Sequence, residues 1–423
     1  MVLHPDLQRG SDSRAADSRL EEAVGLALAI ELEVVWQESL RLTKPKAATL
    51  FGGGVVERIA GVIKAEEISI AVVDSDLSPV QQRNLEKAWD CKVIDRTGLI
   101  LEIFGARAKT HEGRLQVELA ALNYQRSRLV RSWTHLERQR GGAGFMGGPG
   151  ERQIELDRRL IDERIIRIKS DLKQVARTRG LHREARQRVP YPVVALVGYT
   201  NAGKSTLFNR LTHSAVFAKD LLFATLDPTM RRLSLPGGQD IILSDTVGFI
   251  SNLPTHLVAA FRATLEEVVE ADLILHVRDI AHEESLAQKQ DVEAVLRDLG
   301  VDPENSATNL IEVWNKIDLL APEERERTLR HAAAQPGQVA VSAIDGEGVD
   351  LLGDAIEGNL TRQNAEIDVD VELSDGATIA WLYEHGRVKQ RRDDERHAHL
   401  RVSLDRRNLE RLSRRPGIQV PPN

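Results

Sequence analysis

Hydrophobic residues in the first quarter of the chain occur in short runs that are separated by amphipathic stretches. The nearly continuous apolar runs, which predict buried β-strands, are residues 23–30, 68–73 and 91–94. The stretches 55–65 and 78–89 have apolar residues at helical spacing and predict α-helices. Because strands that alternate with helices form parallel sheets, we expect a small α/β domain over residues 21–110.

The pattern changes over residues 111–189, where apolar side chains recur at the spacing of two packed helices. The seam positions are Leu115, Leu119, Leu122, Leu129, Trp133 and Leu136 in the first half, and Ile161, Ile165, Ile168, Leu172 and Val175 in the second. Between them the sequence GGAGFMGGPG, residues 141–150, contains too much glycine for a helix. We therefore expect a long antiparallel helical hairpin with a glycine-rich tip that carries Phe145 and Met146.

The remaining segments complete a predicted order of domains. Residues 1–20 are polar, so we expect a disordered tail. Two prolines in residues 188–192 mark a linker, and a second α/β domain follows over residues 190–364. Residues 365–423 predict a strand, a helix, a strand and a closing helix, which is the pattern of a small α+β domain.

Composition excludes several classes of protein. Hydrophobic residues make up 42% and charged residues 29% of the 423 residues, the balance of a globular chain with a sizeable core. Cys91 is the only cysteine, which excludes an intramolecular disulfide and a cysteine-rich metal site. No apolar stretch reaches the roughly 18 residues of a membrane span, and the polar N-terminus has no apolar leader. We therefore expect a cytoplasmic protein without a membrane span.

Charge is distributed unevenly along the chain. The net charge is −7, but residues 111–189 contain 18 Lys and Arg against 10 Asp and Glu, a net of +8, so the rest carries −15. A basic block in an acidic protein is a candidate surface for a polyanion. Arg138, Arg140 and Arg152 flank the aromatic tip, which favours RNA binding. The alternatives are a solvated hairpin and a tip that packs on a neighbouring domain.

A phosphate-binding loop follows the first strand of the second α/β domain. The apolar residues 193–197 lead into Gly198-x4-Gly203-Lys204-Ser205, and a helical pattern comes next, as in the P-loop of a Ras-like NTPase domain. Backbone N–H groups would surround the phosphates, Lys204 would reach the β and γ oxygens, and Ser205 would ligate Mg²⁺. The candidate nucleotide-binding residues here are Gly198, Tyr199, Thr200, Asn201, Ala202, Gly203, Lys204, Ser205 and Thr206.

A second motif, Asn315-Lys316-Ile317-Asp318, follows another apolar strand and predicts which base is bound. An Asp carboxylate can accept hydrogen bonds from N1–H and N2–H₂ of guanine, whereas adenine lacks this pair of donors. The motif begins 111 residues after Lys204, in the order expected of a base-recognition loop. Ser342 and Ala343 would complete the pocket through a backbone N–H to the guanine carbonyl. The sequence therefore predicts GTP and GDP as ligands.

Two motifs between these predict the contacts of the γ-phosphate and the metal. In Asp245-Thr246-Val247-Gly248, Asp245 would hold Mg²⁺ through a water molecule and the Gly248 N–H would sense the γ-phosphate. The segment Phe223-Ala224-Thr225-Leu226-Asp227 is a candidate switch I, with Thr225 as the second Mg²⁺-ligating hydroxyl and Thr229 as the alternate. The candidate metal ligands are therefore Ser205, Thr225 and Asp245, and the candidate catalytic residues are Lys204, Thr225 and Gly248. Both segments would order only with a γ-phosphate bound, which makes a two-state switch.

These motifs, in this order, resemble those of the HflX family of ribosome-associated GTPases. The resemblance spans about residues 50–345 and includes GYTNAGKST, FATLDPT, DTVGF and NKID, with LSPVQQRNLE and GGAGFMGGPGE upstream. It implies a cytoplasmic GTPase that binds the large (50S) ribosomal subunit and, in its GTP-bound state, dissociates stalled or stress-damaged ribosomes. It also implies that residues 141–150 contact ribosomal RNA.

The residue after the DTVG motif differs from that of the small signalling GTPases. Phe249 stands where those enzymes carry the glutamine that orients the attacking water, and a phenyl ring cannot form that hydrogen bond. We therefore expect slow intrinsic hydrolysis unless other groups substitute. In related GTPases an asparagine at the place of Asn201 helps to hold K⁺ against the β and γ phosphates, so K⁺ is a further candidate cofactor. The alternative is that Asn201 only tightens the loop.

A different function is also compatible with the sequence, namely a GTP-controlled switch that recruits protein partners through the hairpin. The net charge of +8 separates the two hypotheses, because RNA binding weakens steeply with salt whereas an apolar protein interface does not. A third hypothesis, an RNA-remodelling ATPase, conflicts with the NKID motif. We expect a monomer, since the hairpin seam can be satisfied within one chain.

Overall fold

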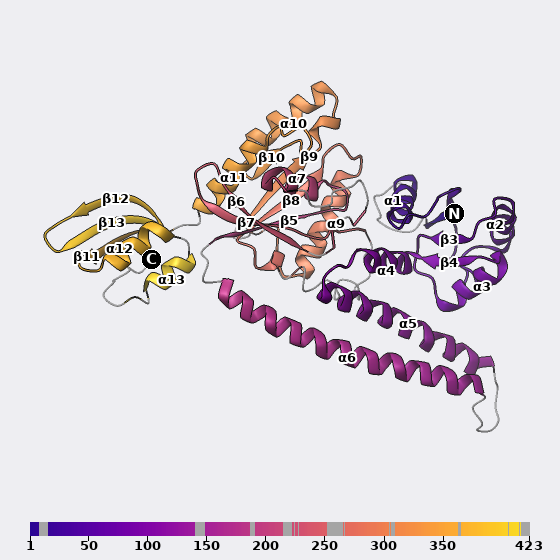
Figure 1. Ribbon diagram of the computed structural model, residues 1–423. Helices are drawn as coiled ribbons and strands as arrows, with labels where there is room; N and C mark the ends of the chain where they lie inside the picture. The colour runs from indigo at the N-terminus through magenta and orange to yellow at the C-terminus, as the bar shows by residue number, and fades with distance from the viewer. Residues whose placement is uncertain are drawn as a thin grey trace.

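The computed structural model contains an N-terminal domain, a helical hairpin, a central domain and a C-terminal domain (Figure 1). The N-terminal and C-terminal domains lie on opposite sides of the central domain (Figure 1). No helix in the described part of the chain is both long and apolar enough to span a membrane. The structure describes residues 1–7, 16–139, 149–186, 191–214, 222–251, 265–303, 305, 309–362, 365–413 and 415, except residues 224, 227, 266 and 405.

The N-terminal domain is a parallel sheet with the strand order β2-β1-β3-β4, which confirms the predicted parallel α/β architecture. Its strands are β1 (Val2–Leu7), β2 (Gln37–Leu42), β3 (Ile70–Val73) and β4 (Lys92–Asp95), and its helices are α1 (Ala16–Ala29), α2 (Gly53–Ala65), α3 (Pro79–Trp89) and α4 (Arg96–Arg107). The strand order reverses between β1 and β3. In open parallel sheets this is the place where a crevice opens at the carboxyl ends of the strands.

The sequence prediction for residues 23–30 is wrong. They were expected to form a strand, but most of them belong to α1, which buries Ala23, Leu26 and Ala27 on one side. The spacing of these three residues is helical, and alanine and leucine favour a helix. The second half of α1 packs in a hydrophobic cluster that also contains residues of the central domain, which explains why residues 23–30 are apolar without interruption.

The predicted tail over residues 1–20 is also corrected. Residues 2–7 form β1, which lies between β2 and β3 in the sheet, and Val2 and Leu3 are buried. The polar side chains of His4 and Asp6 obscure the apolar pattern of this short strand. Residues 8–15 lie outside the described residues.

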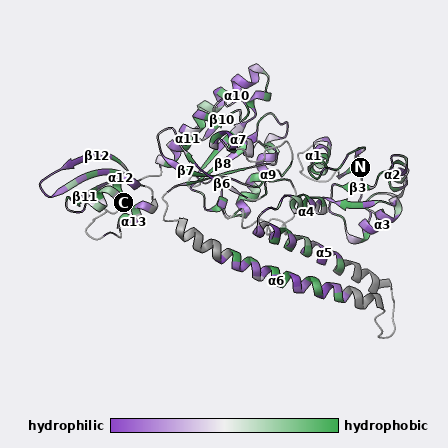
Figure 2. Ribbon diagram, in the orientation of Figure 1, coloured by the Kyte–Doolittle hydropathy of each residue, from purple (hydrophilic) through white to green (hydrophobic). Residues whose placement is uncertain are grey.

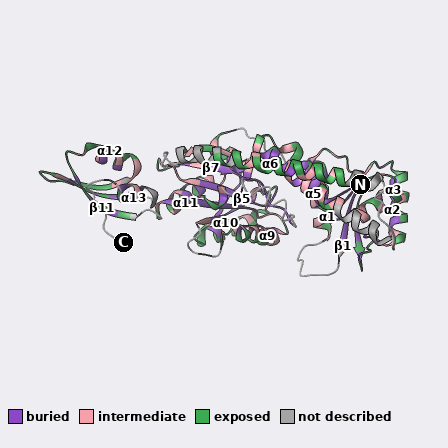
Figure 3. Cartoon of the chain, turned by 90° about the horizontal axis from the view of Figure 1, so that it is seen from below, coloured by how far each residue is buried: buried purple, intermediate pink, exposed green. Residues whose placement is uncertain are grey.

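Helices α5 (His111–Gln139) and α6 (Pro149–Arg186) pack against each other as the predicted hairpin (Figure 1). Ile165 and Ile168 are buried in the seam, and Arg164 Nε lies 2.7 Å from Glu118 Oε1 across it. The 38 residues of α6 span about 57 Å at 1.5 Å per residue. Much of α6 is exposed (Figure 3). Phe145 and Met146 at the tip lie outside the described residues.

The central domain is a sheet with the order β10-β9-β8-β5-β7-β6, parallel except for β6 beside β7. Its elements are β5 (Val193–Gly198), α7 (Lys204–Thr212), β6 (Thr229–Ser234), β7 (Asp240–Asp245), β8 (Leu273–Asp279), α9 (Ser285–Asp298), β9 (Leu310–Asn315), η1 (Ile317–Leu319), α10 (Pro322–Ala334), β10 (Gln338–Ala340) and α11 (Val349–Arg362). Hydrophobic residues gather on the central strands, whereas α10 is largely hydrophilic (Figure 2). Because β5, β7, β8 and β9 are parallel, the loops after them meet at one edge.

The C-terminal domain consists of an antiparallel sheet with the strand order β11-β13-β12 and of the helices α12 and α13. Its elements are β11 (Ala365–Glu372), α12 (Gly376–His385), β12 (Arg387–Asp393), β13 (His397–Leu404) and α13 (Arg406–Ser413). The α+β architecture agrees with the prediction. Strand β12 was not predicted, because its sequence RVKQRRD contains a single apolar residue and reads as a polar loop.

The N-terminal and central domains share one hydrophobic cluster. It joins Leu26 of α1 and Phe104 of α4 to Phe249 and Phe223 of the central domain. The rings of Phe104 and Phe223 meet edge to face, with their centroids 4.8 Å apart. Phe223 belongs to the candidate switch I and Phe249 directly follows the DTVG motif, so the N-terminal domain packs on both candidate switch segments.

Candidate nucleotide-binding site

The predicted phosphate-binding loop connects β5 to α7 at the carboxyl edge of the central sheet. Residues 199–203 form the loop, and Ser205 and Thr206 lie in the first turn of α7. Gly203 has left-handed backbone angles with φ of 90°, and a Cβ there would lie 2.2 Å from Asn315 Nδ2. A Cβ on Gly198 would lie 2.1 Å from the Val277 carbonyl oxygen. Both positions therefore require glycine.

The loop encloses the side chain of Lys204, which is only 6% exposed. Its Nζ donates hydrogen bonds to the carbonyl oxygens of Tyr199, at 2.8 Å, and Gly198, at 3.2 Å. Burial lowers the pKa of Lys204 to about 8, although the charge of Asp245 acts in the opposite direction. An ammonium group that is desolvated and held by neutral carbonyls gains a strong partner when phosphate oxygens enter the loop.

Three oxygens converge beside Lys204, as a magnesium site requires. Ser205 Oγ lies 2.7 Å from Asp245 Oδ2 and 2.8 Å from Thr225 Oγ1, which in turn lies 3.0 Å from Asp245 Oδ2. Burial raises the pKa of Asp245, and its Oδ1 is covered without a hydrogen-bond partner among the described residues. Hydroxyl and carboxylate oxygens are the ligands that Mg²⁺ prefers, so these residues fit the ion. Thr229 lies in β6.

The segment after β7 runs against the phosphate-binding loop. Thr246 Oγ1 donates to the Leu196 carbonyl at 2.6 Å, and Val247 is buried. The Phe249 N–H donates to the Gly198 carbonyl at 3.1 Å, and its carbonyl accepts from the Thr200 N–H at 2.7 Å. The phenyl ring of Phe249 is 1% exposed and lies in the cluster shared with the N-terminal domain. This ring therefore faces the domain junction.

The base-recognition motif is fastened to the phosphate-binding loop by Asn315. Its Nδ2 donates to the Ala202 carbonyl at 2.8 Å, and its Oδ1 accepts from the Ala343 N–H at 3.0 Å. Lys316 Nζ lies 2.8 Å from Asp279 Oδ2, and Ile317 is fully buried. Asn315 thus brings together three loops that the sequence assigned to one site.

The group expected to recognise guanine is available. Asp318 Oδ1 is covered and has no hydrogen-bond partner among the described residues. Ser342 is buried, and its Oγ accepts a hydrogen bond from the Asp345 N–H at 3.1 Å, which holds the loop that carries Ala343. A covered acceptor without a partner, placed just after β9, is able to accept a hydrogen bond from a guanine base.

The predicted switch I residues are only partly described. Phe223 and Leu226 are buried, and Thr225 joins the cluster of oxygens above. Ala224 and Asp227 lie outside the described residues. Asn201 is exposed and has left-handed backbone angles with φ of 59°, at the outer side of the phosphate-binding loop.

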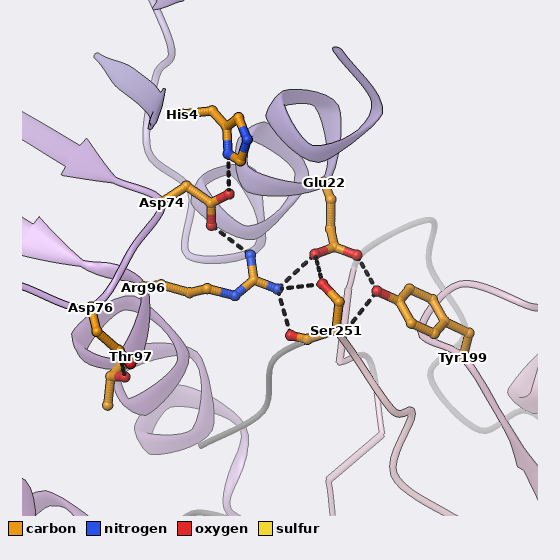
Figure 4. A network of polar contacts seen from close by, with 8 residues as sticks. All are labelled: His4, Glu22, Asp74, Asp76, Arg96, Thr97, Tyr199 and Ser251. Carbon is orange, nitrogen blue, oxygen red and sulfur yellow. Dashed lines mark hydrogen bonds and ion pairs between the residues drawn. The ribbon is translucent and has the colours of Figure 1, made fainter. Parts of the chain in front are cut away.

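A polar network joins the N-terminal domain to this site (Figure 4). The Arg96 guanidinium lies between two carboxylates, with Nη1 2.5 Å from Asp74 Oδ1 and Nη2 2.6 Å from Glu22 Oε1. Nη2 also donates to the Ser251 carbonyl at 2.9 Å. The Ser251 N–H donates to the Tyr199 hydroxyl at 2.8 Å, and that hydroxyl contacts Glu22. The network therefore reaches both the phosphate-binding loop and the segment after DTVG.

Sequence reasoning did not find Glu22, Arg96 or Ser251. Arg96 is 74 positions from Glu22 and 155 positions from Ser251, so no local motif joins them. One signal was present. Arg96 is the first residue of a helix that continues as TGLILEIF, whose apolar residues predict burial, and a buried charge must be paired.

Sequence models of known families match successive regions of the chain. They are described as GTP-binding GTPase N-terminal (residues 17–105), GTP-binding GTPase middle region (107–186), 50S ribosome-binding GTPase (193–316) and HflX C-terminal domain (328–423). The first three correspond to the N-terminal domain, the hairpin and most of the central domain. The fourth begins within α10 and includes the C-terminal domain.

Similar proteins extend over nearly the whole chain. A solved GTP-binding protein from Sulfolobus solfataricus, in complex with GDP, is 23% identical with a TM-score of 0.45 and covers 86% of this chain and 99% of its own. The GTPase HflX of Escherichia coli is 46% identical over 340 residues, 80% of this chain and 78% of that protein. The GTPase HflX of Magnetococcus marinus is 50% identical over 422 residues, 99% of this chain and 95% of that protein. The chain therefore belongs to the HflX family of GTPases.

Proposed function

We propose that this GTPase binds the 50S ribosomal subunit in its GTP-bound state and couples GTP hydrolysis to the dissociation of stalled or stress-damaged ribosomes. The observation that carries the proposal is a basic hairpin, with a net charge of +8 over residues 111–189. Its first helix is joined to the switch region, by which we mean switch II, the segment of residues 245–251 that contains the DTVG motif. The match of residues 193–316 to a family described as 50S ribosome-binding GTPase supports the same partner.

The connection from the hairpin to the switch region runs through Asp95, at the end of β4. Asp95 accepts a hydrogen bond from the Tyr124 hydroxyl of α5 at 2.5 Å and pairs with Arg128 of the same helix. It also caps α4, because its Oδ1 accepts from the Gly98 N–H at 2.8 Å. The next residue is Arg96, which contacts Ser251. A force on α5 is therefore expected to act on α4 and on switch II.

The proposal assigns each group of the site to one part of the nucleotide. Asp318 accepts the two guanine donors, while the loop from Gly198 to Gly203 and the Lys204 ammonium hold the phosphates. Ser205, Thr225 and Asp245 would hold Mg²⁺, which neutralises charge on the β and γ phosphates when it is bound. The Oδ1 atoms of Asp245 and Asp318 support these assignments, since both are buried acceptors without a hydrogen-bond partner in the described part of the chain.

Hydrolysis joins a water oxygen to the γ-phosphorus and breaks its bond to the β–γ bridging oxygen, which yields GDP and inorganic phosphate. The ring of Phe249 faces the domain junction and leaves the water without the usual glutamine. We propose that K⁺ beside Asn201 supplies part of the missing stabilisation. Asn201 is exposed and so is open to such an ion.

Ribosome binding is tested by measuring GTP hydrolysis with and without 50S subunits at two salt concentrations. The expected result is strong stimulation that falls steeply with salt, because basic residues displace counterions from RNA. The exposed hairpin pair Lys169→Glu with Lys173→Glu should weaken binding, whereas the exposed α10 pair Arg327→Glu with Arg330→Glu should not. Ribosome dissociation is then measured as a loss of 70S particles in sedimentation profiles recorded with GTP.

The rival hypothesis predicts a different result. If the hairpin recruits protein partners, the subunits should not stimulate hydrolysis, GTP binding should remain intact and the charge reversal should have little effect. Replacement of K⁺ by Na⁺ at constant ionic strength tests the second cation separately, since an unchanged rate would contradict a role for K⁺. We also expect a monomer in the cytoplasm, and light scattering of the purified protein tests the oligomeric state.

A further inference from the structure

The side-chain hydroxyl of Thr200, a residue of the phosphate-binding loop, has no role in the proposed nucleotide site, where the loop acts through its backbone. Thr200 is 6% exposed, and its hydroxyl is covered without a hydrogen-bond partner among the described residues. Asp245 Oδ1 and Asp318 Oδ1 share this property in the same site, and the proposed function gives each of them a ligand partner. An unpaired buried hydroxyl is unfavourable unless some state of the protein supplies its partner.

The surroundings of Thr200 consist of groups that face the γ-phosphate in the proposed site. A Cβ added to Gly248 would lie 2.9 Å from both Cα and Cγ2 of Thr200, and 3.0 Å from Lys204 Nζ. The Thr200 N–H is fixed to the Phe249 carbonyl at 2.7 Å. The Thr200 side chain therefore lies where the phosphate-binding loop and switch II touch, beside the lysine and the glycine that are expected to contact the γ-phosphate.

The two branches of the Thr200 side chain have different surroundings. The methyl group packs toward Gly248, where any larger residue would collide with it, whereas the hydroxyl has no hydrogen-bond partner among the residues that the structure describes. Gly248 belongs to the segment that is expected to respond to the γ-phosphate, and it lies directly against the Thr200 side chain. Phe249 cannot orient a water molecule, which leaves that task to a neighbouring group.

We propose that the Thr200 hydroxyl orients the attacking water in GTP hydrolysis and takes over the task of the absent switch II glutamine. This inference rests on the proposed nucleotide site. The hydroxyl accepts a hydrogen bond from the water, the water oxygen bonds to the γ-phosphorus, and the bond to the β–γ bridging oxygen breaks. The water proton leaves with the phosphate product, so Thr200 is unchanged by the reaction.

Substitutions of Thr200 separate the hydroxyl from the shape of the side chain. Thr200→Val keeps the branched shape and removes the hydroxyl, whereas Thr200→Ser keeps the hydroxyl and removes the methyl group. The readouts are the single-turnover rate of GTP hydrolysis and the affinities for GDP and a non-hydrolysable GTP analogue. We expect Thr200→Val to lower the rate about 10- to 100-fold with both affinities within twofold, and Thr200→Ser to retain at least a third of the rate.

Three results would overturn the assignment. One is a Thr200→Val rate within twofold of the unmodified protein. Another is an equal loss in the Val and Ser variants, which would indicate packing against Gly248. The third is a parallel loss of GDP affinity, which would indicate that the hydroxyl only maintains the loop. Asp318→Asn is measured alongside. If this variant leaves GTP affinity unchanged, the nucleotide site is misassigned. If it lowers GTP affinity as expected, a negative result for the Thr200 variants overturns only the role of Thr200.

Discussion

Arg96 offers the sharpest test of how the N-terminal domain is joined to the GTPase domain. Its guanidinium is buried with two carboxylates, those of Asp74 and Glu22, and also contacts Ser251 of the central domain. Burial by itself would raise the pKa of Asp74, but the charge of Arg96 and the hydrogen bonds from His4 and Arg96 hold that pKa below its ordinary value. The variant Arg96→Met keeps most of the volume and removes the charge.

The expected loss follows from the burial of the partners. Removing one member of a buried ion pair costs about 3–5 kcal/mol, because the other member stays desolvated without compensation. Asp74 keeps its contact with His4 at 2.8 Å, which limits the loss. The penalty should shrink at acid pH, since burial then raises the pKa of Asp74 and the carboxylate can take up a proton.

Hydrogen exchange measures this loss where it occurs. Protection of the α1 and α4 amides in Arg96→Met should fall roughly 10²- to 10³-fold, since each factor of ten corresponds to about 1.4 kcal/mol. Arg58→Met is the matched control, because Arg58 pairs with Glu38 at 2.7 Å on the surface of the same domain and should contribute about 0–1 kcal/mol. Equal protection in the two variants would refute the reasoning.

Three further predictions concern the central domain. Asp318→Asn should weaken GTP binding at least tenfold and improve binding of xanthosine triphosphate, in a competition titration, because the amide matches the xanthine carbonyl. His276 is buried and its pKa is lowered to about 3. Its contribution to the free energy of unfolding is therefore complete above pH 6.5 and is lost as the pH falls from 6.5 toward 3, with a slope of at most about 1.4 kcal/mol per pH unit. His276→Gln should flatten this acid limb in urea denaturation; an unchanged slope contradicts the assignment. Gly248→Ala should slow hydrolysis at least tenfold, because its Cβ would collide with the Thr200 backbone, whereas Gly358→Ala on α11, with open space around it, should not.

Much of the central domain could be predicted because the residues of its candidate site occur in contiguous sequence motifs. The loop from Gly198 to Ser205 and the motif Asn315–Asp318 each follow a buried strand, and parallel strands bring their carboxyl ends to one edge. Ser205, Thr225 and Asp245, which the motifs assigned to one magnesium site, lie within hydrogen-bond distance of one another. Local chemistry and strand order were sufficient there.

The domain junction could not be predicted in this way. An uninterrupted apolar run such as residues 23–30 fits a buried strand as well as a buried helix, and α1 gains its buried surroundings from the cluster that the two domains share. The partners of Arg96 lie far away in sequence, so the spacing of residues along the chain cannot predict these hydrogen bonds. Strand β12 was missed because it is exposed and contains little apolar sequence. Backbone pairing with the neighbouring strand β13 holds it in the sheet.

The amide of Asn315 sets the time at which the nucleotide site can be completed during synthesis. It bonds to Ala202, 113 residues earlier in the chain, and to Ala343, 28 residues later. A nascent chain that has emerged only as far as β9 has the whole phosphate-binding loop but lacks the segment that holds this amide from the other side. Contacts of such long sequence separation form late in folding. The enzyme should therefore acquire its affinity for guanine nucleotides in one step, after residue 343 has left the ribosome on which it is made.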